Sequence, residues 1–178
     1  MNYLFTTKRL QVRQLKMEDL ATLHKMHSNA KVMIYTGSEP QTLAQDQENL
    51  KHIISSYNRI DNVFWVWGVE RKSDQKLIGT CALLKTKTDN PEDEIGYRFS
   101  EEHWGNGYAF ETAQGLIPYV FSHFKKEYLV AETDELNLAS VKILEKLMTF
   151  IKTEFNPRFQ SNDRIYRIDQ TAYLEPND

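Results

Sequence analysis

The sequence predicts an α/β (α+β) fold with a mixed, mostly antiparallel central sheet of six to seven strands and about four helices on its faces. Two observations support this prediction. Three strand candidates follow one another across short turns, which favours an antiparallel meander. Before and after the meander, apolar residues recur at helical spacing, so helices precede it and alternate with strands behind it. Elements in this order pack as a sheet covered by helices.

The individual elements follow from local patterns along the chain. Alternation predicts a first strand over residues 10–14, and a helical stripe follows. Pro40 suits the first turn of a second helix. Pro118 should bend the long apolar helix, or at least remove its hydrogen bond to the Gln114 carbonyl. In chain order the remaining predictions are helices over 17–27 and 40–58, strands over 63–69, 77–84 and 94–100, a helix over 110–124, a strand over 128–133, a helix over 138–150, an optional strand over 151–155 and a closing strand over 165–174.

Length and composition restrict the class of protein. The chain has 178 residues, 40% of them hydrophobic, and a formal net charge of −3. This predicts one domain over residues 1–178. The charge balance argues against nucleic-acid or membrane partners, which select clustered Lys and Arg. Cys81 is the single cysteine, which excludes an internal disulfide, and no apolar run suits a signal peptide or a membrane span. We therefore expect a cytoplasmic protein.

The most informative stretch is Trp-Gly-Asn-Gly-Tyr-Ala, residues 104–109, directly before the long helix. Its two glycines and its alanine remove side chains where the first backbone N–H groups of a helix point outward and the helix dipole is positive. Such a turn can hold a phosphate or diphosphate, or can simply connect strand and helix tightly. Phe110 occupies the third small position of a dinucleotide loop, and no Lys-Ser/Thr pair follows, so neither common nucleotide motif fits.

A set of motifs in fixed order extends this signal over residues 94–148. The motifs are Glu94-Ile95-Gly96-Tyr97, Trp104 to Ala109, Glu111, Asn137-Leu138-Ala139-Ser140 and Leu144-Glu145-Lys146-Leu147. With them the sequence resembles the GNAT superfamily of acyl-CoA-dependent N-acetyltransferases, and within it the branch of ribosomal-protein N-terminal (alanine/serine) acetyltransferases. Trp104, where most of the superfamily has Gln or Arg, is typical of this branch.

The resemblance implies acetyl-CoA as cosubstrate and no metal. The backbone amides of residues 105–109 would bind the CoA diphosphate. The third meander strand and the strand after the long helix would diverge to admit the pantetheine arm, which would pair with the backbone near Arg98 and Phe99 and contact the Asn137 amide. The implied cofactor-binding residues are Arg98, Phe99, Trp104, Gly105, Asn106, Gly107, Tyr108, Ala109 and Asn137.

Glu94 is the first candidate for general base. An amine must lose a proton to attack a thioester, several superfamily members carry a base on this strand, and a half-buried carboxylate can have a raised pKa. Alternatively, Glu94 is a strand charge that pairs with Arg98 on the same face. Asp93 and Glu132 are weaker candidates.

Ser140 is the second candidate catalytic residue, because the branch often has Ser near the CoA sulfur. The tyrosine that many members use as the acid is replaced here by Leu144. Ser140 can also be a helix-capping residue, and so can Asn137. A further departure from the superfamily is Met148-Thr149-Phe150 in place of Gly-Phe, which would lengthen or redirect the connection to the last strands.

The sequence therefore predicts an acetyl-CoA-dependent N-acetyltransferase that transfers the acetyl group directly to a protein N-terminal amine or a small-molecule amine, as a monomer or homodimer. The acceptor would enter opposite the cofactor, past residues 35–40. Two alternatives stay open: a CoA-binding module without turnover, and a nucleotide-dependent transferase. His24 and His27 lie at helical spacing, but without a third ligand they do not predict a metal site.

Overall fold

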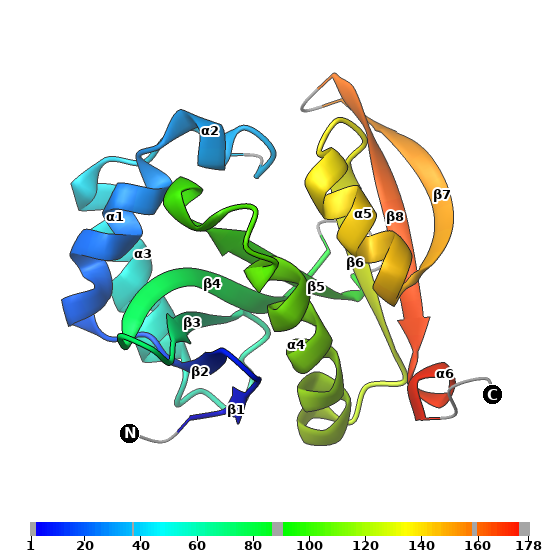
Figure 1. The fold of residues 1–178 in the computed structure, drawn as a ribbon, viewed down its shortest axis with the longest axis horizontal. Helices are drawn as coiled ribbons and strands as arrows, with labels where there is room; N and C mark the ends of the chain where they lie inside the picture. The colour runs from blue at the N-terminus through cyan, green and yellow to red at the C-terminus, as the bar shows by residue number, and fades with distance from the viewer. Residues whose placement is uncertain (1–2, 37, 87–90, 158–159, 175–178) are drawn as a thin grey trace.

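The computed structural model describes residues 3–36, 38–86, 91–157 and 160–174. Eight strands form one sheet in the order β1-β2-β3-β4-β5-β6-β8-β7 (Figure 1). The prediction of a mixed, mostly antiparallel sheet is confirmed, because among these strands only β5 and β6 pair in parallel. The strands are β1 (Phe5–Thr6), β2 (Leu10–Gln14), β3 (Trp65–Arg71), β4 (Lys76–Lys85), β5 (Asp93–Phe99), β6 (Tyr128–Asp134), β7 (Thr149–Asn156) and β8 (Ser161–Asp169).

The strand count exceeds the predicted six to seven. The extra strand, β1, has two residues, which is too short to give a periodic pattern, and it pairs with β2 through Phe5 and Val12. The predicted meander is confirmed, since β3, β4 and β5 pair antiparallel in sequence order.

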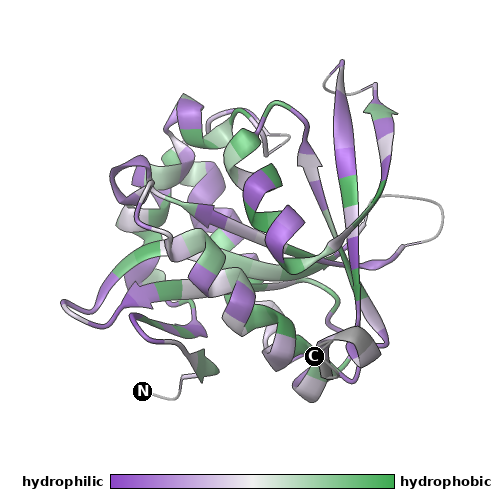
Figure 2. Ribbon diagram, turned by 45° about the vertical axis from the view of Figure 1, so that its right-hand side comes forward, coloured by the Kyte–Doolittle hydropathy of each residue, from purple (hydrophilic) through white to green (hydrophobic). Residues whose placement is uncertain are grey.

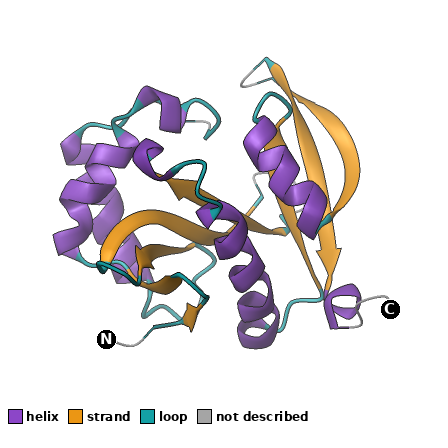
Figure 3. Ribbon diagram, viewed as in Figure 1, coloured by secondary structure: helices purple, strands orange, loops and turns teal. Residues whose placement is uncertain are grey.

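Four helices of eight or more residues lie among the described residues, as predicted, with shorter ones beside them (Figure 3). The second helix begins later than expected, because Thr42 rather than Pro40 caps it and exchanges hydrogen bonds with Gln45. The helix around Pro118 is continuous. The helices are η1 (Met17–Asp19), α1 (Leu20–His27), α2 (Ala30–Met33), α3 (Leu43–Ser56), η2 (Glu101–His103), α4 (Tyr108–Phe124), α5 (Leu138–Leu147) and α6 (Gln170–Leu174).

The C-terminal predictions were partly wrong. The helix predicted over 138–150 ends at Leu147, because Met148 takes an extended conformation and β7 begins at the next residue. The departure at Met148 therefore does not lengthen this connection. Strand pairing with β8 outweighs the helical spacing of apolar residues here. The centres of the Phe150 and Tyr166 rings lie 5.7 Å apart. The closing strand predicted over 165–174 begins earlier, as β8, and its last five residues form α6.

The core lies on both faces of the sheet. Helix α4 covers one face, where hydrophobic residues gather on the helix and on the central strands beside it (Figure 2). On the other face, α1 and α3 pack through a second cluster that includes Leu23 and Leu50. Cys81 is buried in the first cluster, and burial raises the pKa of its thiol. No helix among the described residues has the length and apolar character to cross a lipid bilayer.

The sheet opens between β5 and β6. These strands share one register pair, Glu94 with Val130, whereas β5 pairs with β4 over its whole length. The predicted divergence of the two strands is thus confirmed. The start of α4 lies beside this opening, so the fold places a helix N-terminus next to a gap in its own sheet (Figure 1).

Candidate functional site

A cavity of about 610 Å³ occupies the opening between β5 and β6. This volume is in the usual range for small-molecule sites. Its walls come from β5, the loop before α4, the α2 region, β6 and the start of α5. The predicted site residues that line the cavity are Glu94, Arg98, Phe99, Trp104, Gly105, Gly107, Tyr108, Ala109, Asn137 and Ser140.

The loop between η2 and α4 has a backbone that requires glycine at two positions. Gly105 and Gly107 have φ values of 73° and 75°, a region that side chains disfavour. Gly107 is the N-cap residue of α4, and no side chain caps the helix there. The first N–H groups of a 17-residue helix therefore remain available for an anion.

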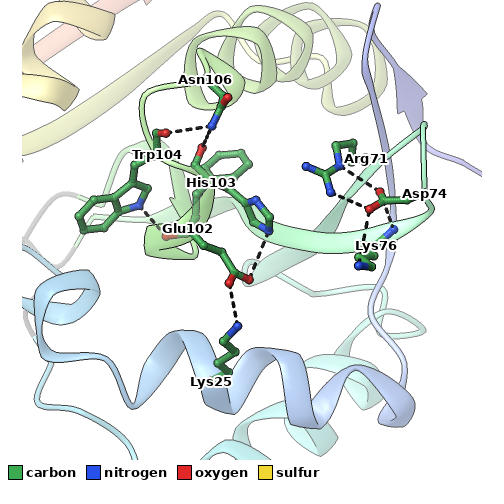
Figure 4. A network of polar contacts seen from close by, with 9 residues as sticks. Lys25, Arg71, Asp74, Lys76, Glu102, His103, Trp104 and Asn106 are labelled. Atoms are coloured by element: carbon green, nitrogen blue, oxygen red, sulfur yellow. Dashed lines mark hydrogen bonds and ion pairs between the residues drawn. The ribbon is translucent and has the colours of Figure 1, made fainter.

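Asn106 is the one predicted cofactor residue that does not line the cavity. Its side-chain Nδ2 donates to the carbonyls of His103 and Trp104 and so closes the loop (Figure 4). On the same side, Glu102 lies 2.9 Å from the Lys25 ammonium of α1 and 3.6 Å from the His103 ring. Burial lowers the pKa of His103. The two hydrogen bonds of the Asn106 side chain hold the loop in its conformation.

A second set of contacts, which the sequence did not predict, ties the loop and the start of α4 to the N-terminal residues Thr7 and Arg9. The Glu111 carboxylate accepts hydrogen bonds of 2.6 Å from the Thr7 hydroxyl, the Arg9 backbone N–H and Arg9 Nε. Arg9 Nη1 donates to the Asn106 carbonyl, and its guanidinium lies 4.6 Å from the centre of the Tyr108 ring. Burial alone would raise the pKa of Glu111, but these bonds outweigh it and lower the pKa. Only the position of Glu111 in the motif set signalled its importance.

Trp104 connects the loop to the end of β5. Its indole N–H donates to the Phe99 carbonyl at 2.8 Å, and the side chain is 47% exposed. The ring therefore stands at the cavity wall without filling it. One lone pair of the Phe99 carbonyl is already used by this bond, which leaves one for a ligand.

Three acidic residues were candidates for the base, and the structure separates them. Asp93 forms ion pairs of 3.1 Å with Lys85 and Lys126 and does not line the cavity. Glu94 lies on β5 at the pair with Val130, where the opening begins. Glu132 lies two residues further along β6 and also lines the cavity. Partial burial, followed by repulsion from nearby carboxylates, raises the pKa of Glu132.

Ser140 meets Tyr97, which the sequence analysis named only as the last residue of the motif at positions 94–97. The Tyr97 hydroxyl lies 3.0 Å from Ser140 Oγ, and both residues line the cavity. Burial raises the pKa of Tyr97 to about 12, so this hydroxyl keeps its proton at neutral pH. The Asn137 side chain accepts from the Ser140 backbone N–H at 3.3 Å, which confirms the capping role. Alternation along β5 predicts which face of the sheet Tyr97 occupies, but it does not predict the contact with Ser140 of α5.

Comparison with known proteins agrees with this geometry. The sequence matches the acetyltransferase (GNAT) domain family over residues 9–148. The uncharacterized N-acetyltransferase YoaA of Bacillus subtilis is 30% identical over 146 residues, 79% of each chain.

Two solved structures share the fold. The Salmonella typhimurium acetyltransferase that modifies the N-terminal serine of 50S ribosomal protein L7/L12 superposes with a TM-score of 0.78 at 13% identity, covering 94% of this chain and 99% of that one. The Vibrio cholerae spermidine N-acetyltransferase in complex with CoA and spermine gives a TM-score of 0.75 at 22% identity, with the same coverage.

The fold, the opened sheet and the uncapped helix define this protein as an N-acetyltransferase, an enzyme that transfers an acetyl group to an amine. The chain belongs to the acetyltransferase (GNAT) domain family, which confirms the resemblance seen in the sequence.

Proposed function

We propose that this N-acetyltransferase uses acetyl-CoA and binds its diphosphate at the start of α4. The observation that carries the proposal is the parallel pair β5–β6, which opens after one register pair beside a helix start that no side chain caps. The glycines of the loop fit this role, because a Cβ at Gly107 would be strained at its positive φ and would lie 3.5 Å from Arg9 Nη2. The bound cosubstrate would supply the activated acetyl group.

The thioester arm of the cosubstrate fits the opening itself. Arg98 and Phe99 line the gap that β6 leaves, so an extended pantetheine can pair with this edge of β5 as a strand would. Asn137 Oδ1 is used in capping, whereas its Nδ2 donates no hydrogen bond among the described residues. That amide nitrogen is available for a pantetheine carbonyl.

Two carboxylates handle the amine in this proposal. Glu132 accepts the proton, since it lines the cavity and its raised pKa brings it closer to the pKa of an amine. Glu94, the first choice from the sequence, lies across the opening and attracts the cationic amine. The two roles are separable, because loss of the base reduces kcat and loss of attraction raises KM.

The Tyr97–Ser140 pair serves the leaving thiolate. The Tyr97 hydroxyl stays protonated well above neutral pH, so it can donate to the sulfur either directly or through Ser140 Oγ. This pair takes the place of the acid that is missing at Leu144, a residue that is 1% exposed.

The acceptor amine would enter from the side of α2. Of the predicted entrance over residues 35–40, Tyr35 and Thr36 line that end of the cavity, residues 38–40 do not, and residue 37 lies outside the described residues. The named relatives act on different amines: a ribosomal-protein N-terminus in one case and spermidine in another. We carry forward both predicted acceptor classes, a protein N-terminus and a small molecule, together with a monomer or homodimer, a cytoplasmic location and a single domain over residues 1–178.

The test combines binding and turnover. Calorimetry should show that the protein binds CoA and does not bind ATP. Incubation with labelled acetyl-CoA and mixed amines should give an acetylated product. Glu132→Gln and Tyr97→Phe should each lower kcat about a hundredfold with CoA affinity kept. CoA binding without product for any amine would instead support a binding module, and tight ATP binding would support the nucleotide-dependent alternative.

A further inference from the structure

Arg98 lies on the face of β5 that is turned away from α4. Side chains alternate along a strand, so Glu94, Gly96 and Arg98 share one face, while Tyr97 and Phe99 pack with α4 on the other. Arg98 is opposite Thr80 in the register with β4, on the face covered by α1 and α3. It also lines the cavity. Its side chain is therefore on the acceptor side of the sheet, away from the diphosphate loop.

The charge of Arg98 has no direct partner within the described parts of the chain. No hydrogen bond or ion pair reaches its guanidinium there. Asp46 of α3 stabilises it only from a distance, because the two Asp46 oxygens are bound by His24 Nδ1 at 2.8 Å and His27 Nδ1 at 2.6 Å. Burial, and then the charge of Arg98, lower the pKa of His27, which leaves that ring neutral at pH 7.

This arrangement is unfavourable without a ligand. Arg98 lines the cavity and is only partly exposed, and desolvation lowers its pKa to about 10. A partly desolvated guanidinium is strongly stabilised by a carboxylate, which can accept two parallel N–H bonds. Lys31, the other cationic side chain at the cavity mouth, is already paired with Glu101 at 2.6 Å.

Gly96 leaves room between the two charged ends of the site. A Cβ built on Gly96 meets no atom within 4 Å, so the strand is open there. Glu94 lies two residues before Gly96 on this face and Arg98 two residues after it, each about 7 Å from Gly96 along the strand. Glu132 lies on the opposite side of the opening. The face thus presents carboxylates for an ammonium at one end and a cation for an acid at the other.

We propose that the acceptor is an amine that also carries a carboxylate, of about the size of a free amino acid, and that Arg98 binds this carboxylate. The inference rests on the proposed function and specifies its substrate class. A polyamine would bring a second cation next to Arg98, which costs free energy. A neutral peptide N-terminus would leave the guanidinium unpaired. Both are therefore poorer acceptors than a zwitterion.

The test uses matched acceptors. Each of the twenty free amino acids is assayed beside its C-terminal amide, with spermidine and a neutral peptide as further acceptors and acetyl-CoA as donor. We expect at least one free amino acid to exceed its own amide at least tenfold in kcat/KM. This preference is informative because the amine of the amide is less basic, so its intrinsic reactivity at neutral pH is greater.

Variants then assign the preference to Arg98. Arg98→Gln should remove most of it through a higher KM for the acid, Arg98→Lys should keep part of it, and CoA affinity should stay unchanged in both. Lys31→Gln is the matched control, because it removes a cavity-mouth cation that is already paired, and should leave the preference intact.

Several results would overturn the inference. Equal rates for acids and amides in the wild-type protein would do so even if no Arg98 variant folded. So would spermidine or the neutral peptide as the best acceptor, or an Arg98→Gln variant that lowers kcat equally for every acceptor. Acetylation of some amine in these cases would leave the proposed function standing, whereas CoA binding without any product would remove both.

Discussion

The tie between Glu111 and the N-terminal strands gives the sharpest stability prediction. Glu111→Ala removes the acceptor of three hydrogen bonds that connect α4 to Thr7 and Arg9, about a hundred residues away in sequence. The Glu111 side chain is 13% exposed and that of Arg9 is 44% exposed. The ion pair is therefore partly screened and contributes under about 1 kcal/mol. The bonds from the Thr7 hydroxyl and the Arg9 N–H are charge-assisted and contribute more.

We expect Glu111→Ala to lower the free energy of unfolding by about 2–4 kcal/mol. Glu111→Gln keeps one acceptor oxygen and should cost about half of that. The same change loosens the loop at Asn106, so CoA affinity should fall severalfold, because ordering the loop then opposes binding.

Urea unfolding at pH 7 measures the first effect, and calorimetry with CoA measures the second. Glu48→Ala is the matched control, since it removes an exposed glutamate whose one polar contact within the described part of the chain is an ion pair with Lys51 of the same helix. It should change stability by less than about 0.5 kcal/mol. If Glu111→Ala changed stability no more than this control, the tie would have no energetic role and the reasoning would be refuted.

Three further predictions concern separate parts of the molecule. Arg13→Leu should destabilise the fold by about 3–5 kcal/mol in urea unfolding, because Asp19 and Glu70 would stay buried without their cation; a loss below 1 kcal/mol would contradict this. Gly105→Ala should cost about 1 kcal/mol through its φ of 73° alone, since no atom lies within 4 Å of the new Cβ, and an unchanged melting temperature would exclude that strain. The raised pKa of Glu132 means that the folded state binds its proton more tightly than the unfolded state does, so this residue destabilises the fold as pH rises through the interval between the ordinary and the raised values. Glu132→Gln should therefore melt higher than the wild-type protein at pH 7 and equally below pH 4, while losing activity; a lower melting temperature at pH 7 would count against the assigned direction.

Local patterns in the sequence were sufficient for most of the fold. Strand alternation and helical spacing report which face of an element is buried, and this gave the meander, α4 and the antiparallel character of the sheet. The loop glycines and the motif set also indicated the family. The sequence failed where pairing competed with local preference, as at Met148, or where an element was too short for a period, as in β1.

Contacts between distant residues were decided only by the tertiary structure. Tyr97 meets Ser140 across 43 positions, Glu111 meets Thr7 across 104, and the charge of Asp46 in α3 acts on Arg98 in β5. Such contacts depend on strand register, on the order of strands in the sheet and on how the helices cross it, and a repeating hydrophobic pattern carries none of these. The sequence thus determined which residue types were available for acetyl transfer, and the packing of the sheet against its helices determined which of them meet, because burial is a local property and proximity is not.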